Sequence, residues 1–112
     1  MTLEKRWEAM WLLPLHDDVV VEYTQSGKRV CGRHNMQALR GHHASKLGFS
    51  IRSVLGSCDL WVTEYVISYD ERPVYTVSIM EFRDGKVARE TQYFAGPFDP
   101  PPWRAEWVER RE

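Results

Sequence analysis

The sequence predicts a single α+β domain in which a bent antiparallel sheet wraps around helices, and three observations lead to this class. Helical spacing of apolar residues occurs only within the first 48 residues. From residue 49 onward, β-branched and aromatic residues alternate with polar ones in long runs. A chain of 112 residues has room for one hydrophobic core, so we treat residues 1–112 as one domain.

The first part of the chain predicts two helices and a returning strand pair. In TLEKRWEAMWLL, residues 2–13, apolar side chains recur at helical spacing and Pro14 ends the pattern. DDVVVEY, residues 17–23, is β-branched and predicts a strand, and TQSGKRVCG turns the chain back. A second helix is expected over residues 33–48, with one side formed by Met36, Leu39, His43 and Leu47.

The remainder predicts a four-stranded antiparallel meander. The expected strands are residues 49–56, 60–69, 73–83 and 86–94. Turn residues separate them, and the Asp84-Gly85 pair is a strong hairpin signal. Strands of this length need curvature and a covering layer, which the helices must supply.

Composition excludes several classes of partner. The net charge of −1 gives no basic footprint for nucleic acid, and no apolar run is long enough to cross a membrane. Without a signal peptide pattern, the cytoplasm is the expected location. Cys31 and Cys58 are expected to be buried thiols, and neither has metal-site spacing, so no metal and no cofactor are expected.

The C-terminal stretch GPFDPPPWRAEWVERRE combines prolines with two tryptophans. The prolines predict an extended loop, followed by a short helix that begins near Pro101 or Pro102. On such a helix Trp103 and Trp107 would share a face. We expect these indoles to cover either the mouth of the curved sheet or a neighbouring copy of the chain.

Four segments resemble a known family: HDDVVVEY, SGKRVCGRHNMQAL, EFRDGKVARETQYF and PFDPPPWRAEWV. They are similar to the SnoaL-like branch of the nuclear transport factor 2-like superfamily, which includes ketosteroid isomerases, limonene-epoxide hydrolases and polyketide cyclases. The resemblance implies a cystatin-like α+β cone whose concave side encloses an apolar pocket and whose convex side pairs with a second subunit. Family members carry two helices before the strand that matches residues 17–23, so the first helix is expected to be missing here.

The resemblance also indicates which catalytic residues of the related enzymes are replaced in this chain. Where ketosteroid isomerases carry an aspartate base and a protonated oxyanion-stabilising acid, this chain has Tyr23 and Met80, so that isomerisation route is not expected. Where the epoxide hydrolases carry an arginine and two aspartates, this chain has Tyr65, Ile67 and Gln92. An amide cannot take a proton from water, so that hydrolysis route is not expected either.

Strand alternation, aligned on the family positions, assigns side chains to the two faces. The expected ligand pocket consists of Tyr23, Trp61, Tyr65, Ser78, Met80, Gln92 and Phe94. Alternation also places Thr63, Ile67, Thr76 and the carboxylate Glu90 on this face. Glu90 is the candidate catalytic residue, because burial would raise the pKa of its carboxyl. The alternative is that Glu90 lies at the solvated rim or pairs with Arg33 or Arg104. The histidines are expected at the surface. As an alternative, His34 or His43 faces the pocket and works with Glu90.

The opposite face predicts an interface. Its expected residues, which mix apolar side chains with charges of both signs, are Glu64, Val66, Ile79, Glu81, Arg89, Thr91 and Tyr93. We expect homodimerisation through this face. Three functions remain open: a module that binds a small apolar or aromatic molecule, a cyclase- or isomerase-like enzyme that uses Glu90, and a structural dimerisation domain whose cavity is filled.

Overall fold

The computed structural model describes residues 14–42 and 47–111, which form six strands, one α-helix and a short 3-10 helix. The helix expected over residues 2–13 lies outside the described residues, as does His43. The elements in chain order are β1 (Leu15–Tyr23), β2 (Lys28–Cys31), α2 (Arg33–His42), β3 (Leu47–Ser57), β4 (Leu60–Tyr69), β5 (Arg72–Arg83), β6 (Lys86–Ala95) and η1 (Pro102–Arg104).

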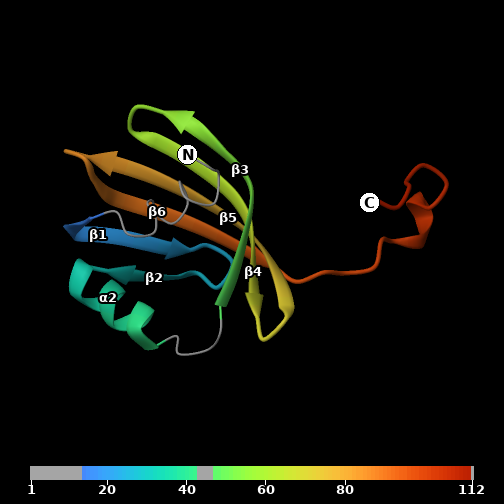
Figure 1. Cartoon of the computed structure of the whole chain (residues 1–112), viewed down its shortest axis with the longest axis horizontal. Coiled ribbons are helices and arrows are strands. Elements are labelled where there is room, and N and C mark those ends of the chain that lie inside the picture. The colour runs from blue at the N-terminus through green and yellow to red at the C-terminus, as the bar shows by residue number, and fades with distance from the viewer. Residues whose placement is uncertain (1–13, 43–46, 112) are drawn as a thin grey trace.

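The strands form one curved sheet in the order β2-β1-β6-β5-β4-β3 (Figure 1). Strands β3 to β6 make the predicted antiparallel meander. The predicted α+β class with a curved sheet is confirmed, and the sheet as a whole is mixed because β1 pairs with β6 in parallel. Side chains alternate with the same period in both kinds of pairing, so the alternation alone does not reveal the direction of a neighbouring strand.

Tight turns join the meander strands in the backbone conformation that suits twisted hairpins. Asp70 and Glu71 have φ angles of 49° and 70°, and Asp84 and Gly85 have φ angles of 54° and 75°. Positive φ at both central residues is typical of a type I′ turn, whose twist matches that of the flanking strands. At the β3–β4 hairpin, a Cβ on Gly56 would lie 2.3 Å from the carbonyl oxygen of Leu60, so the close approach of the two strands requires glycine.

Helix α2 covers the inner face of the sheet beside β1. Its Met36 is buried against Val19, Val21 and Met80, and Leu39 packs against the same cluster. The helix ends at His42, and Leu47 already begins β3, so the expected helix over residues 33–48 was too long. The two glycines within that segment weaken a helix, and the apolar side chain of Leu47 satisfies a strand pattern equally well.

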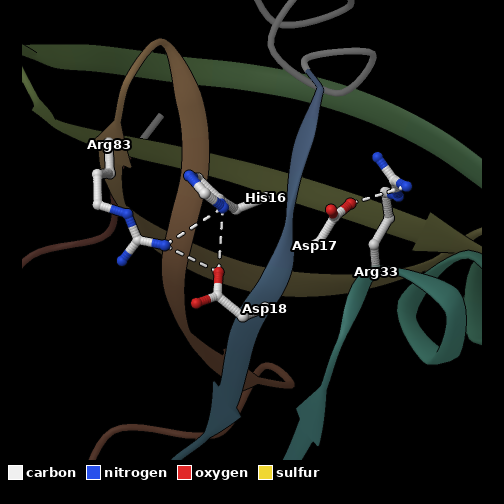
Figure 2. Close-up of polar contacts among 5 residues, drawn as sticks. All are labelled: His16, Asp17, Asp18, Arg33 and Arg83. Atoms are coloured by element: carbon white, nitrogen blue, oxygen red, sulfur yellow. Dashed lines mark hydrogen bonds and ion pairs between the residues drawn. The ribbon is translucent and has the colours of Figure 1, made fainter.

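Exposed ion pairs fasten β1 to its neighbours (Figure 2). Arg83 Nη2 lies 2.9 Å from Asp18 Oδ1, and His16 Nδ1 lies 3.1 Å from the same oxygen. On the other side of the strand, Arg33 Nη2 lies 2.8 Å from Asp17 Oδ1. Water screens pairs that are this exposed, so they define the position of β1 more than they stabilise it.

The C-terminal stretch carries its two tryptophans away from the sheet. After β6 the chain runs outward and turns around η1 (Figure 1), and Arg111 near its end lines a groove together with Tyr75 and Tyr93 of the sheet. Trp103 and Trp107 are each 73% exposed, so the expectation that they roof the sheet of their own chain was wrong. The free thiols Cys31 and Cys58 are exposed as well, against the expectation that they are buried.

Candidate functional site

The register of the sheet brings polar side chains into one row on the inner face. Thr63 on β4 lies opposite Ser78 on β5, and Ser78 lies opposite Gln92 on β6. Gln92 in turn lies opposite Tyr23 on β1. Because side chains of directly paired residues point to the same face, the four side chains form a line across four strands. Thr63, Ser78 and Gln92 are buried and Tyr23 is partly buried.

Three members of the inner face form a hydrogen-bonded cluster, which we call the inner polar cluster: Tyr65, Ser78 and Gln92. The hydroxyl groups of Tyr65 and Ser78 lie 2.8 Å apart. The Gln92 amide nitrogen donates to the Tyr65 hydroxyl at 3.2 Å and to Ser78 Oγ at 3.1 Å. Tyr65 is 1% exposed and Ser78 is completely buried, so these bonds form away from water, where they are stronger than on the surface.

The donors of the inner polar cluster can be counted. The Gln92 amide has two hydrogens, and the hydroxyls of Tyr65 and Ser78 have one each. Within the cluster the Gln92 amide donates to both hydroxyl oxygens, and the bond between the two hydroxyls uses one hydroxyl hydrogen. The other hydroxyl hydrogen therefore points out of the cluster, from Ser78 if Tyr65 donates and from Tyr65 if Ser78 donates.

Glu90 lies beside this cluster on β6 and is 3% exposed. Burial raises the pKa of its carboxyl, while the nearby Arg40 guanidinium and a hydrogen bond with Ser78 act in the opposite direction. Arg40 Nη2 lies 3.9 Å from Glu90 Oε1. The alternative of a solvated rim position is therefore wrong.

The alternative partners considered for Glu90 lie elsewhere. Arg33 pairs with Asp17 at 2.8 Å, and the Arg104 guanidinium lies over the Trp103 ring at 5.9 Å from its centroid. His34 is exposed at the start of α2. Among the residues that the structure describes, the ion pair of Glu90 is thus made by an arginine of α2.

The two tyrosines of the inner face are proton donors and not bases. Burial raises the pKa of Tyr23, and the Glu90 carboxylate adds to the effect. Burial also raises the pKa of Tyr65, against the hydrogen bond with Ser78. Both phenols therefore keep their protons at neutral pH and can donate a hydrogen bond to an acceptor.

An apolar wall adjoins the inner polar cluster. Tyr65 and Ile67 are buried, and the partly buried side chains that pack against them are Phe49, Ile51, Tyr69 and Phe94. The ring of Phe94 lies 6.1 Å from that of Tyr23, and Phe49 lies 6.4 Å from Tyr65. An apolar surface that surrounds a few polar groups is the usual composition of a small-molecule site.

Two residues that we assigned to the expected pocket serve the fold. Met80 packs in the core with Met36 and Val21. The indole of Trp61 donates to the Cys58 carbonyl at 3.1 Å and so closes the β3–β4 turn. The structure therefore brings together Tyr65, Ser78 and Gln92, with Tyr23 and Phe94 adjoining, and does not join Trp61 to them by a hydrogen bond.

Arg40 was missed in the sequence, although a signal for it existed. It lies four residues after Met36, and residues four apart share one face of a helix. Since Met36 is buried, Arg40 must point toward the sheet as well, and a cation there indicates an acidic partner. The partner proved to be Glu90.

Among residues 14–42 and 47–111, no group of three or more histidine, cysteine, aspartate or glutamate side chains could hold a metal ion. Over the same residues, no helix has the length and apolar character needed to cross a bilayer.

The outer face carries a groove beside the end of β6. Its volume is about 280 Å³, and its lining residues are Gln25, Arg52, Glu64, Tyr65, Val66, Tyr75, Thr76, Val77, Tyr93, Phe94, Ala95 and Arg111. Charges nearby are paired within the sheet: Arg52 with Glu64 at 3.5 Å and Arg89 with Glu22 at 2.7 Å.

Solved structures resemble this chain in sequence and in fold. An NTF-2-like protein of unknown function from Burkholderia xenovorans is 51% identical, with a TM-score of 0.78, over 97% of this chain and 85% of that one. A steroid delta-isomerase from Pseudomonas aeruginosa is 20% identical, with a TM-score of 0.61, over 72% of this chain and 62% of that one. An LEH-like epoxide hydrolase from M. tuberculosis is 21% identical, with a TM-score of 0.55, over 72% and 65%. At such low identity the two enzymes show the fold alone.

Comparisons with protein-family descriptions and with curated proteins gave no match.

Proposed function

Because the chain belongs to the NTF2-like family, whose fold also carries isomerases and epoxide hydrolases, we propose that it binds a small, largely apolar molecule through one oxygen-bearing group. The inner polar cluster carries this proposal. Three hydrogen-bonding side chains are buried beside an aromatic wall, although apolar residues of similar size would fill a core without the cost of desolvating polar groups.

The donor count defines the class of ligand group. One hydroxyl hydrogen of the cluster points out of it, and the neighbouring phenol of Tyr23 keeps its proton at neutral pH. These groups suit an acceptor such as a ketone or ether oxygen. The aromatic rings of Tyr23 and Phe94 are placed to contact the apolar body of such a ligand.

Glu90 sets the direction of the hydrogen bonds in this proposal. When Glu90 is ionised, Ser78 donates to it and Tyr65 donates to Ser78. When Glu90 is protonated, its acid hydrogen goes to Ser78, Ser78 donates to Tyr65, and the Tyr65 hydrogen turns outward to a ligand. Binding of an acceptor ligand should therefore strengthen as the pH falls.

A fluorescent aromatic ketone, 6-propionyl-2-dimethylaminonaphthalene, tests this proposal directly, because its emission reports both polarity and hydrogen bonding of its carbonyl. We expect saturable binding with blue-shifted emission, weakened about tenfold by Tyr65→Phe, since a lost hydrogen bond is worth about 1 kcal/mol or more. Tyr93→Phe removes the same atom from the outer face and should leave binding unchanged.

Two results would contradict binding at the inner face. One is equal affinity of the ketone for wild type and Tyr65→Phe. The other is no saturable binding of any apolar carbonyl compound, which would favour a structural domain whose inner face is filled by its own side chains.

A second candidate function is proton transfer at a carbon next to a carbonyl, with Glu90 as the general base. Its burial at 3% exposure and the raised pKa of its carboxyl favour this candidate, because both bring a carboxylate toward the range of a useful base. The test is hydrogen–deuterium exchange at the α-carbons of 2-tetralone in D2O, followed by NMR. Exchange should be accelerated by wild type and lost in Glu90→Gln, and equal exchange rates in both would exclude Glu90 as the base.

A further inference from the structure

The C-terminal arm, residues 96–111, exposes large apolar side chains to an unusual degree. Phe98 is 77% exposed, Trp103 and Trp107 are 73% exposed, and Val108 is 46% exposed. A single exposed apolar residue needs no explanation, but four large exposed apolar residues within positions 98–108 are an unusual concentration of apolar surface. Such a surface marks an interaction site.

The arm has a defined local structure. Its prolines fix φ and favour an extended chain, which carries the segment away from the sheet (Figure 1). At η1 the amide of Ala105 donates to the Pro102 carbonyl at 3.2 Å, and the amide of Trp107 donates to the Arg104 carbonyl at 3.0 Å. The Arg104 guanidinium lies over the Trp103 ring. The indoles are therefore presented by an ordered turn.

The groove on the outer face is the complementary surface in the same molecule. Tyr75 and Tyr93, which line it, are 46% and 41% exposed, and Val66 and Val77 line it as well. Among the described arm residues only Arg111 lines the groove, and none of the four apolar arm residues does. Each chain thus displays both an apolar arm and an apolar groove that its own arm does not fill.

Charge favours a second copy of this chain as the occupant. The charged residues of arm positions 96–111 are Asp99, Arg104, Glu106, Glu109, Arg110 and Arg111, which balance to zero. Of the charged residues that line the groove, Arg52 and Glu64 pair within the sheet, and Arg111 belongs to the arm itself. Apart from the arm residue, the groove therefore carries no net charge, which suits a neutral arm of a second copy.

The buried area is sufficient for a stable dimer. Each aromatic residue can bury roughly 150–250 Å², and the three arm aromatics are about three-quarters exposed, which leaves roughly 350–550 Å² per arm to be covered. Two arms with the groove surfaces they cover would bury roughly 1,400–2,200 Å². Stable interfaces bury about 1,200–2,000 Å².

We propose that two copies of this chain exchange arms, each placing the aromatic residues of its residues 96–111 in the outer-face groove of the other. The arrangement is isologous, so a single two-fold axis satisfies both arms and both grooves and closes the assembly at two chains. The outer face thereby becomes the dimer interface, and the interface depends on the arm. The proposal is independent of what the inner face binds.

Light scattering after size-exclusion chromatography tests the arm. Wild type should have a mass of about 26 kDa, twice the 13.2 kDa of the chain, and Trp103→Ala/Trp107→Ala should have the mass of one chain or dissociate at least tenfold more readily. Trp103→Phe/Trp107→Phe keeps most of the apolar area and should remain a dimer. A monomeric wild type at 100 µM, or an alanine variant that dimerises like wild type, would overturn the proposal.

Mixing two full-length variants tests the exchange. Tyr93→Glu places an unpaired charge in the groove and leaves the arm intact, while the alanine variant loses the arm and keeps the groove. Each should be monomeric alone. The mixture at 100 µM should form a heterodimer that is weaker than the wild-type dimer, because one intact arm meets one intact groove and the second contact is missing. Retention of each variant's melting temperature shows that both are folded. If the folded variants do not associate on mixing, arm exchange is wrong.

Discussion

The inner face and the C-terminal arm reverse the usual distribution of polar and apolar side chains. The inner polar cluster is buried, and its members satisfy one another through hydrogen bonds. The arm carries three aromatic side chains that are about three-quarters exposed. The comparison teaches that buried polar groups can find partners within one chain, whereas exposed apolar side chains cannot be removed from water without another surface.

The two regions should also differ in which property depends on them, the stability of the folded chain or its association with another chain. Changes to the inner polar cluster should lower the free energy of unfolding, since its bonds form in the folded chain. Changes to the arm should leave that free energy almost unaffected and act on association. We therefore expect the largest effects on stability at the inner polar cluster and the smallest in the arm.

The largest effect is expected for Gln92→Leu. The change removes the amide that donates to Tyr65 and Ser78, so each of these two buried hydroxyls loses one of its partners. We expect a loss of about 2 kcal/mol in the free energy of unfolding, measured by urea denaturation. Thr91→Val on the other face of the same strand is the control and should cost less than about 0.5 kcal/mol. Equal costs would show that the cluster contributes nothing specific.

Removal of a tyrosine hydroxyl should lower the free energy of unfolding more on the inner face than on the outer face. Tyr65→Phe deletes a hydroxyl that contacts both Ser78 and Gln92, and we expect a loss of about 1 kcal/mol. Tyr93→Phe deletes a hydroxyl on the outer face and should change the free energy of unfolding by less than about 0.5 kcal/mol. Both values come from the same denaturant titration, and a larger cost for Tyr93→Phe would reverse the comparison.

Glu90→Gln should change the pH dependence of stability. Since burial raises the pKa of Glu90 above its ordinary value of 4.5, the folded state holds the proton more tightly than the unfolded state does. Stability from this group is complete below pH 4.5 and is lost as the pH rises through the folded pKa. We expect the melting temperature of the variant to gain on that of wild type as the pH rises from 4.5 to 7. A constant difference across this range would show that Glu90 has an unshifted pKa.

The smallest effect on a single chain is expected in the arm. Trp103→Ala/Trp107→Ala removes side chains that are mostly exposed, so the variant should unfold at low protein concentration within about 0.5 kcal/mol of wild type. The melting temperature of wild type should rise with protein concentration, and that of the variant should not. A large loss of stability at low concentration would mean that the arm packs on its own chain.

Much of the fold could be predicted from the sequence because its signals are local. Alternation identified β4, β5 and β6 to within about a residue or two, and Asp84-Gly85 identified their last hairpin. The parallel pairing of β1 with β6 joins residues far apart in sequence, and no local pattern encodes it. The end of α2 was missed because Leu47 suits a strand as well as a helix.

The site was predictable in part for the same reason. Alternation assigned Glu90 and Gln92 to the inner face, where both are buried. The partner of Glu90 depends on how α2 packs across the sheet, so Arg40 could be inferred only from its spacing to Met36. The path of the tail after the prolines is not set by alternation or helical spacing, and Trp103 proved to lie away from the sheet.

The most direct measurement of ligand binding at the inner face is a ¹H–¹⁵N NMR titration of the protein with 2-tetralone. We expect the side-chain amide signal of Gln92 to shift until the site is saturated. In Tyr65→Phe the same shift should need about tenfold more ketone. The indole signals of Trp103 and Trp107 should stay in place. Shifts of the indole signals with an unmoved Gln92 amide would mean that the ketone binds the exposed arm, and would contradict recognition by the inner polar cluster.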